Sequence, residues 1–415
     1  MDNNNEVEVP PFFLCPISLE IMRDPVSLST GITYDRESIE TWLSTSKNSL
    51  CPITKRPISD MDLTPNHNLR RLIQSWCTLN SSHGIERIPT PKSPISKAKI
   101  AKILRDAEKP QLQQKCLRWL RSIVSHNTSA KRCMEATGAV EFLSSLINTT
   151  SQNQSLALEV GSLIDIKTTS DDALYILYHL QLSELGLKSL VAKDSAFTES
   201  LTRIMQRGPY ESRAYGVLLL KSMFEVAEPM QIITLRQEFF AEAVQVLHDQ
   251  ISHQATKATL KLLINLCPCG RNRIKAVESG AVSVLIELLF DCSDRRTSEL
   301  MLMLLEMLCQ CAEGRSELLR HGAGIAVVSK RILRVSQMAS ERAVRILLSV
   351  SKFSATASVA QEMLQLGVAA KLCLVLQVDC GRKIKEKAIE ILKLHARVWK
   401  HSPCIPSNLL SSHAS

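Results

Sequence analysis

The sequence CPIS at residues 15–18 returns almost unchanged as CPIT at residues 51–54. Zinc-binding loops often carry Cys-x-x-Cys pairs, because two thiolates at that spacing help to close a tetrahedral metal site. Here a hydroxyl residue stands in place of the second thiolate, and hydroxyl groups are good hydrogen-bond partners but poor zinc ligands. The segment between the two loops adds Tyr34 and Asp35 but no Cys or His. We therefore predict a small domain in which polar contacts take the place of bound zinc.

The flanking residues predict that this domain is α+β. Residues 24–26 and 32–34 are short β runs on either side of a turn at residues 29–31, which is a hairpin pattern. Asp35 follows and can cap a helix whose apolar face carries Ile39, Trp42 and Leu43. After the second loop, residues 63–66 lead into another helix, with apolar residues at Leu69, Leu72, Ile73 and Trp76.

Three strings carry a resemblance to a known family. They are PFFLCPISLEIMRDPVSLSTGITYDRESIETWL (residues 11–43), CPITKRPI (51–58) and LTPNHNLRRLIQSWC (63–77). Together they closely resemble the plant U-box family over residues 8–82. The resemblance implies a RING-type E3 ubiquitin ligase that forms no covalent intermediate. Such a protein binds a ubiquitin-charged E2 enzyme and holds the thioester in a reactive conformation, which is catalysis by positioning; it implies no metal and no cofactor.

Carried over residue by residue, the E2-contact surface of the family falls on Ile17 and Leu19 of the first loop, Trp42 of the helix and Pro52 of the second loop. Exposed apolar groups of this kind suit a transient protein contact. The alternative is that Ile17 and Leu19 are core residues, since a small domain needs all of its apolar side chains for its core.

Many of these ligases use an arginine directly after the second loop to bridge E2 and ubiquitin. That position is Lys55 here, with Arg56 next to it, and lysine lacks the planar fork of arginine. Both residues are therefore linchpin candidates. Ser18, Asp35 and Thr54 are the candidate members of the network that replaces the metal.

Two other interpretations of the loop cysteines carry less weight. Cys15 and Cys51 could be catalytic thiols of another ligase class, but a nucleophilic cysteine needs an activating base and neither has a histidine close in sequence. A zinc RING is the third interpretation, and it lacks the paired thiolates.

Composition limits the remaining possibilities. The chain has 415 residues, of which 45% are hydrophobic but only 4% aromatic, so its core is aliphatic as in many helical proteins. The net charge of +9 is modest and the basic residues are scattered, which disfavours nucleic-acid binding. Thirteen cysteines without a signal-peptide pattern indicate reduced thiols, so we expect the cytoplasm, with the nucleus as the alternative. No apolar run is long enough for a membrane span, so we expect no integral membrane association.

Residues 83–95 are predicted to be a linker because prolines stand among small and basic residues. Ser/Thr-Pro pairs are acceptors for proline-directed kinases, and a phosphate would change the local charge strongly. The candidate phosphorylation sites are Thr64, Thr90 and Ser93. The alternative is that these prolines only stiffen the chain.

Beyond the linker, a helical pattern repeats with a period near 42 residues. Gly280, Gly322 and Gly367 lie between apolar runs and stand 42 and 45 residues apart. Glycine suits a tight turn between helices because its backbone adopts conformations that other residues resist. An earlier copy of the pattern lies at residues 136–140, and two degenerate copies lie at residues 195–197 and 238–240. The longer step between the first two of these copies is predicted to hold an insertion at residues 165–172.

A repeat of this length made only of helices predicts an armadillo-like superhelical solenoid over residues 96–400, followed by a disordered tail at residues 401–415. The segment LKLLINLCPCGRNRIKAVESGAVSVLIELL (260–289) resembles the armadillo consensus, including Asn265 and the turn at Gly280. The fold class is therefore mostly α: a small α+β U-box followed by an all-α solenoid. The resemblance implies that substrate proteins bind in the groove of the solenoid.

Two further patterns in the repeats favour packing over chemistry. Cys267-x-Cys269 and Cys309-x-Cys311 are one repeat apart, and equivalent buried positions in successive repeats suit cysteine as a small hydrophobe better than as a metal ligand. Met301, Met303 and Met307 stand at helical spacing and are predicted to be core residues.

The combined prediction is an E3 ubiquitin ligase whose U-box binds a ubiquitin-charged E2 and whose armadillo repeats recruit substrates, so that substrate lysines receive ubiquitin. Its partners are E2, ubiquitin and substrate proteins, and a homo-oligomer formed through the U-box is a further option. The resemblance suggests a role in plant stress or immune signalling. The alternative is a non-catalytic armadillo scaffold whose U-box only mediates protein interaction.

Overall fold

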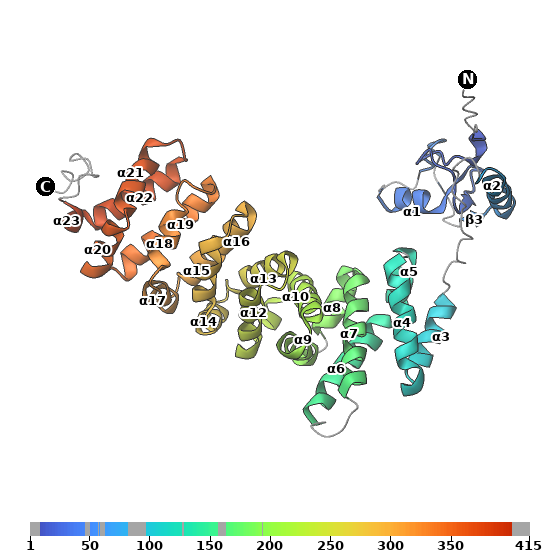
Figure 1. Cartoon of the computed structure of the whole chain (residues 1–415), viewed down its shortest axis with the longest axis horizontal. Helices are drawn as coiled ribbons and strands as arrows, with labels where there is room; N and C mark the ends of the chain where they lie inside the picture. Colours follow the sequence, from blue (N-terminus) through green and yellow to red (C-terminus); the bar gives the residue numbers. More distant parts are fainter. Residues whose placement is uncertain are drawn as a thin grey trace. The chain divides into compact units, whose positions relative to one another are not determined.

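The computed structural model describes residues 9–45, 50–56, 58, 63–81, 97–126, 128–156, 163–192 and 194–400. The chain divides into two compact units, Met1–Pro94 and Ile95–Ser415, shown in Figure 1. The linker predicted at residues 83–95 and the tail predicted at residues 401–415 lie outside the described residues.

The first unit is a small sheet with two helices. The sheet has the order β2-β1-β3, and both pairings are antiparallel, with Val26 opposite Tyr34 on one side and Pro65 on the other. The predicted hairpin is confirmed, and its turn contains Gly31 in the left-handed region at φ 81°. In chain order the elements are η1 (Pro11–Phe13), β1 (Pro25–Ser27), β2 (Thr33–Asp35), α1 (Arg36–Thr45), β3 (Thr64–Pro65) and α2 (His67–Leu79).

Helix α2 covers the sheet with one face. The side chain of Asn66 caps its N-terminus by accepting a hydrogen bond from the Leu69 amide at 3.1 Å. Ile73 is buried, whereas Leu72 of the same apolar set is exposed. The core of this unit also includes Cys15, Val26, Tyr34, Ile39 and Cys51.

The second unit consists of helices in repeats of three, as the armadillo prediction requires. We call the third helix of each repeat a ladder helix, because each one packs against the ladder helices of the neighbouring repeats. The ladder helices follow one another along the unit in Figure 1. They are α4 (Pro110–His126), α7 (Leu163–His179), α10 (Tyr210–Glu225), α13 (His253–Leu266), α16 (Arg295–Leu308), α19 (Gln337–Phe353) and α22 (Arg382–Leu394).

The other helices form two further rows. The second helices are α3 (Lys97–Ala107), α6 (Ala139–Leu156), α9 (Asp194–Arg207), α12 (Gln237–Asp249), α15 (Ala281–Asp291), α18 (Gly324–Lys330) and α21 (Val368–Gln377). The first helices are α5 (Thr128–Ala136), α8 (Glu184–Ala192), α11 (Pro229–Ile233), α14 (Gly270–Glu278), α17 (Ala312–Arg320), α20 (Ala357–Gln365) and α23 (Ala396–Trp399). One continuous aliphatic core joins the repeats, because no single repeat can bury its apolar face alone.

Each predicted repeat segment coincides with the start of a second helix. Gly138, Gly280 and Gly367 precede α6, α15 and α21 and have φ between 70° and 85°, so the conformational reason for glycine is confirmed there. Gly322 differs, because it is not in the left-handed region. In that repeat the constraint lies on Gly324, where an added Cβ would stand 2.0 Å from the carbonyl oxygen of Leu318.

The predicted insertion at residues 165–172 is wrong in its position. These residues lie inside ladder helix α7, which spans Leu163–His179. The extra length of this repeat is partly helical, since α6 has 18 residues where the next second helix, α9, has 14.

Several of the cysteines and methionines that were predicted to pack in the core are buried. Cys267 and Cys309 are fully buried, and burial raises the pKa of each thiol to about 12, as expected for inert core residues. Met301 is buried and Met307 is half-buried against the core, whereas Met303 is half-buried and does not belong to the core cluster. Among the described residues, no cluster of His, Cys, Asp and Glu has the arrangement of a metal site.

Within the described part of the chain, no single helix has both the length and the hydropathy of a membrane span. The pair α20 and α21, bent by 66°, passes this test only when the two helices are taken together.

Candidate functional site: the twin loops of the first unit

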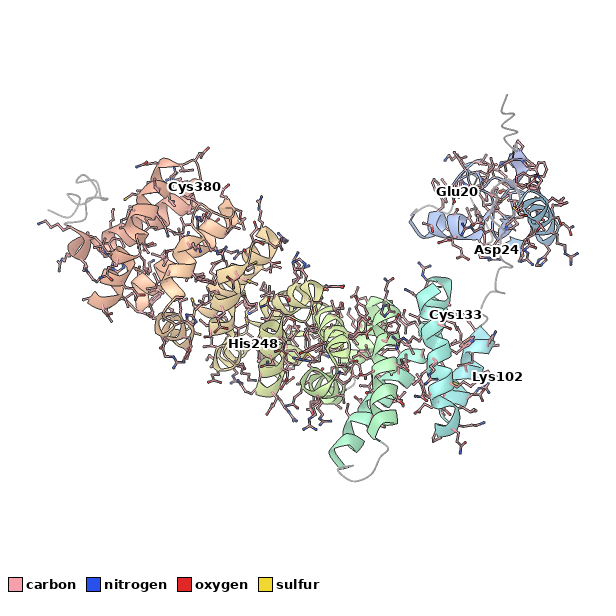
Figure 2. All side chains as sticks on the ribbon, viewed as in Figure 1. Glu20, Asp24, Lys102, Cys133, His248 and Cys380 are labelled. Atoms are coloured by element: carbon pink, nitrogen blue, oxygen red, sulfur yellow. The ribbon has the colours of Figure 1, made fainter. Side chains whose placement is uncertain are left out.

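The first loop is a closed turn around Cys15. The Cys15 amide donates to the Glu20 carbonyl at 2.8 Å, and the Leu19 amide donates to the Cys15 carbonyl at 2.8 Å. The Cys15 thiol accepts a hydrogen bond from the Asp35 amide at 3.3 Å. Burial alone would raise the pKa of Cys15, but hydrogen bonds from the backbone and hydroxyl of Ser18 and from the Asp35 amide lower it. Glu20, labelled in Figure 2, marks the end of this loop.

The second loop repeats this hydrogen-bond pattern. The Cys51 amide donates to the Arg56 carbonyl at 2.9 Å, and the Lys55 amide donates to the Cys51 carbonyl at 3.0 Å. The fifth residue of each loop is in the left-handed region: Leu19 at φ 59° and Lys55 at φ 55°. The repeated tetrapeptide therefore encodes two copies of one turn, and Leu19 and Lys55 occupy equivalent places in it.

Hydroxyl groups surround the second thiol. The hydroxyl of Tyr34 lies 3.1 Å from Cys51 Sγ, and that of Thr30 donates to it at 3.6 Å. Burial acts to raise the pKa of Cys51, but the hydroxyl and amide of Thr54 and the hydroxyls of Tyr34 and Thr30 lower it to about 6. Burial and the nearby Cys51 raise the pKa of Tyr34, so the phenol stays protonated and can donate. Sequence reasoning proposed Thr54 for this network but missed Thr30 and Tyr34.

Strand β2 joins the two loops. Its Tyr34 reaches Cys51, and the amide of the adjoining Asp35 reaches Cys15. The Asp35 carboxylate turns elsewhere: Oδ1 accepts from the amides of Arg23 at 2.7 Å and Asp24 at 2.9 Å. This oxygen therefore fixes the chain between the first loop and β1, a role that the predicted helix cap did not anticipate.

Apolar side chains project from both loops. Leu19 is 74% exposed, which rules out the core interpretation of this residue, and Ile17 is half-buried. In the second loop, Pro52 is half-buried and Ile53 is 53% exposed. Ile53 was not among the predicted site residues, because the resemblance placed the contact of the second loop on Pro52.

Trp42 of α1 connects helix and second loop. Its indole is 36% exposed, and Nε1 donates to the Leu50 carbonyl at 3.2 Å. The ammonium of Lys55 lies 5.6 Å from the centre of the indole ring, within range of a cation–π contact. Lys55 is thus placed against a predicted E2-contact residue, while Arg56 is exposed beside it. We define Ile17, Leu19, Trp42 and Pro52, together with Ile53, as the loop patch.

Comparison with known proteins decides the family. A family model described as "U-box domain" matches residues 9–82, and one described as "Plant U-box protein ARM repeat region" matches residues 99–415. The chain is 59% identical to E3 ubiquitin-protein ligase PUB23 of Arabidopsis thaliana, with 99% of this chain and 98% of that protein covered. It is 58% identical to E3 ubiquitin-protein ligase PUB22 of the same plant, with 99% of each covered.

The chain belongs to the plant U-box family with armadillo repeats. It is an E3 ubiquitin-protein ligase of the U-box type. A solved structure from a study of the interaction between cadherin and beta-catenin has a TM-score of 0.57 to this chain, at 12% identity, with 81% of this chain and 59% of that chain covered. That likeness supports the armadillo fold of the second unit.

Of the three predicted phosphorylation sites, only Thr64 lies among the described residues. Thr64 is exposed in β3, where it stands opposite Ser27 of β1. Thr90 and Ser93 lie outside the described residues.

The ladder helices of the armadillo repeats present a group of aromatic rings. Tyr175, Tyr178 and His179 of α7 lie with Tyr215 of α10, with ring centres between 4.0 and 5.5 Å apart in the contacting pairs. The guanidinium of Arg121 on α4 lies 3.9 Å from the centre of the Tyr175 ring. Since aromatics are only 4% of the sequence, these contacts gather an unusual share of its rings in one place.

Further along the row of ladder helices, charged side chains of α16 and α19 pair with one another. Glu306 of α16 accepts from Arg342 at 2.8 Å and from Arg345 at 3.2 Å, both on α19. Asn265, the residue that matches the armadillo consensus, donates through Nδ2 to the Phe224 carbonyl of the preceding ladder helix at 2.7 Å. We call the surface of the ladder helices that carries these aromatic rings and paired charges the ladder face.

Proposed function

We propose that the loop patch of the U-box binds a ubiquitin-charged E2 enzyme. The observation that supports this most strongly is the exposed Leu19, held in a left-handed turn and clear of the core. A leucine at such a place loses apolar burial and accepts backbone strain, and a partner that covers it would offset both. Ile17, Trp42, Pro52 and Ile53 extend the same surface, which has the aromatic and aliphatic character of a protein contact.

The chemical step needs positioning rather than a nucleophile from this chain. Cys15 and Cys51 are fully buried, so neither thiol can reach an E2 thioester. The U-box instead restricts the motion of the ubiquitin tail, so that a substrate lysine attacks the thioester carbon and the E2 thiolate leaves. Lys55 is our linchpin residue, because its ammonium stands beside Trp42 and is free to donate hydrogen bonds to ubiquitin and E2 carbonyls.

Substrate recruitment belongs to the second unit. We propose that substrate proteins bind the ladder face, where the rings of Tyr175, Tyr178 and Tyr215 offer large rigid contact areas at low entropic cost. Proximity labelling with a Trp42→Ala variant, which keeps this face intact, is expected to retain the substrates of the native protein. A further Tyr178→Ala and Tyr215→Ala change is expected to lose them.

We also propose a cellular location and a signalling role for the protein. We place the protein in the cytoplasm, with the nucleus as the alternative, and in stress or immune signalling, on the strength of the resemblance described above. Imaging of a fluorescent fusion tests the first statement. A stress phenotype in plants that carry the Trp42→Ala protein in place of the native one tests the second.

Autoubiquitination separates the ligase from a non-catalytic scaffold. Trp42→Ala and Pro52→Ala are expected to lower polyubiquitin formation by about tenfold or more, because central apolar anchors contribute most of the energy of such contacts. Leu79→Ala is the matched control, since Leu79 is an exposed leucine at the end of α2, outside the loop patch. Equal polyubiquitin from the native protein and all three variants would refute the site assignment.

A further inference from the structure

Three turns between second helices and ladder helices adjoin along one edge of the armadillo unit. They are residues 292–294, 331–336 and 378–381. Arg331 Nη1 donates to the Cys292 carbonyl at 3.2 Å, which joins the first turn to the second. Gln337, which directly follows the second turn, donates through Nε2 to the Cys380 carbonyl of the third turn at 3.0 Å. We call this the turn edge; Cys380 is labelled in Figure 2.

Four cations gather on the turn edge. Lys330, Arg331 and Arg334 belong to a stretch, residues 318–340, that contains no Asp or Glu. Lys371 is the only charged residue of α21, and its ammonium reaches Ser329 Oγ at 3.2 Å. Within the part of the chain that the structure describes, none of the four forms an ion pair with a carboxylate. The cations of the neighbouring ladder helices differ, since Arg342 and Arg345 both bind Glu306.

Three of these cations are close enough for Arg334 to disfavour the charge of Arg331 and of Lys371. Burial lowers the pKa of Lys371, and the charge of Arg334 lowers it further. Burial and the charge of Arg334 also lower the pKa of Arg331. Arg331 also keeps its Nε buried without a hydrogen-bond partner. An anion placed between these groups would relieve this repulsion and gain charge-assisted hydrogen bonds.

Exposed apolar side chains border the cations. Phe290 at the end of α15 is 58% exposed, and the ammonium of Lys330 lies 5.4 Å from the centre of its ring. Leu333 is 40% exposed and has a left-handed backbone at φ 59°. Met338 at the start of α19 is also exposed. Apolar groups beside unpaired cations are complementary to a segment that mixes acidic and apolar residues.

A purely structural explanation covers only part of this cluster. Arg331 satisfies the Cys292 carbonyl at the end of α15, which is a common task for arginine at a helix C-terminus. The same explanation does not extend to Arg334, which is exposed, or to the exposed Lys330 beside Phe290. These two side chains remain available to a partner.

We propose that the turn edge docks an acidic segment of a partner protein, with carboxylates on Lys330, Arg334 and Lys371 and an apolar side chain against Phe290 and Leu333. A peptide fits better than a membrane surface, because Lys371 and Arg331 are partly buried between helices, where a narrow carboxylate can reach and a flat headgroup layer cannot. This surface is separate from the loop patch and from the aromatic part of the ladder face, and it does not depend on the ligase activity.

The test is a binding measurement on the full chain. The probe is a fluorescein-labelled peptide rich in Asp and Glu around a central Leu-Phe pair, followed by fluorescence anisotropy. Lys330→Glu with Arg334→Glu is expected to weaken binding by about tenfold or more. The control, Lys261→Glu with Lys393→Glu, makes the same charge change at exposed lysines of α13 and α22 and is expected to leave binding within about twofold.

A second variant pair separates binding from folding. Leu333→Gly suits the left-handed backbone and is expected to preserve or raise the melting temperature while weakening the peptide severalfold. Phe290→Ser removes the other apolar contact at an exposed site and should act in the same direction.

Two results would overturn the proposal. One is equal loss of binding in the Lys261/Lys393 control, which would show a response to net charge alone. The other is binding of the native protein to phosphatidylserine-containing vesicles, but not to the peptide, with loss of vesicle binding in the Lys330/Arg334 variant. That second result would assign the turn edge to a membrane.

Discussion

At Leu19 the proposed contact with E2 and the stability of the loop make opposite demands on a single residue. It occupies the left-handed position of the first loop, where a side chain with a Cβ is strained, and it exposes most of its apolar surface. Glycine would fit that backbone better, and the equivalent place in the second loop holds a lysine. Neither the exposure nor the backbone of Leu19 favours leucine for folding, which is why we assign this residue to the proposed E2 contact.

Replacing Leu19 with glycine should separate these two properties. We expect Leu19→Gly to leave the U-box equally stable or more stable, by up to about 1 kcal/mol, because strain is removed. The affinity for a ubiquitin-charged E2 should fall by about tenfold, because an exposed anchor is lost. Chemical denaturation of the full chain measures the first effect and calorimetric titration the second. Unchanged E2 affinity would remove Leu19 from the loop patch.

Cys51 gives the U-box a pH-dependent stability. Hydroxyl donors hold its pKa near 6 in the folded state, below the ordinary value of 9.0 expected in the unfolded chain. Because the folded pKa is lowered, the stabilisation is complete above about pH 9, where the thiol ionises in both states. It declines as the pH falls from about 9 to about 6, where the folded thiol takes up a proton.

Hydrogen exchange measured by mass spectrometry on peptides from residues 9–45 tests this. In the native protein, the free energy of opening of this region should fall between pH 9 and pH 6. In Cys51→Ser, which cannot ionise in that range, the region should be less stable and its pH slope smaller. An identical slope in both proteins would show that another group causes it.

At the scale of elements, the glycines of the repeats serve different purposes. Gly280 precedes α15 with φ 85°, and an added Cβ would meet nothing within 4 Å. At Gly324 the backbone is ordinary, but an added Cβ would stand 2.0 Å from the Leu318 carbonyl oxygen. Gly322 has neither restriction. Glycine is thus required by conformation in one repeat and by close packing in the next.

Alanine substitutions at these three positions should rank accordingly. Gly324→Ala is expected to destabilise most, by about 2 kcal/mol or more, because backbone must move in a packed repeat. Gly280→Ala should cost about 1 kcal/mol through the left-handed backbone, and Gly322→Ala should be neutral or slightly stabilising. Thermal melting of the three full-length variants gives the ranking. A loss at Gly322 equal to that at Gly324 would contradict the packing argument.

The elements themselves could be predicted from the sequence, because their signals are local. The hairpin, both helices of the U-box and the start of each second helix follow from turn residues and apolar spacing. The insertion at residues 165–172 was misplaced, because the added helical turn in α6 leaves no break in the apolar pattern. Whether Gly322 or Gly324 is constrained depends on a neighbouring carbonyl, which a single sequence does not reveal.

The site was predictable to a similar extent. Ile17, Leu19, Trp42 and Pro52 came from the resemblance, and the structure shows how far each is exposed without testing its role. Ile53 and the Tyr34–Cys51 contact were missed, because they depend on how β2 lies against the second loop. The cations of the turn edge stand 37 to 41 residues from Lys371 in sequence, so only the fold brings them together.

At the scale of the whole molecule, the chain couples two units with different physical tasks. The U-box is small, its core is polar where RING domains hold zinc, and its exposed patch suits a carrier that must bind and leave. The armadillo repeats share one long aliphatic core, which supports the face proposed for substrates. Catalysis by positioning then requires only that both partners be held by the same chain.

The discharge of ubiquitin from a charged E2 to free lysine, followed in single turnover with a zinc chelator present, tests the central claim most directly. The native protein is expected to accelerate discharge equally with and without the chelator, and Trp42→Ala is expected to abolish the acceleration in both conditions. Acceleration that the chelator removes, or that survives intact in Trp42→Ala, would contradict a metal-free U-box acting through the loop patch.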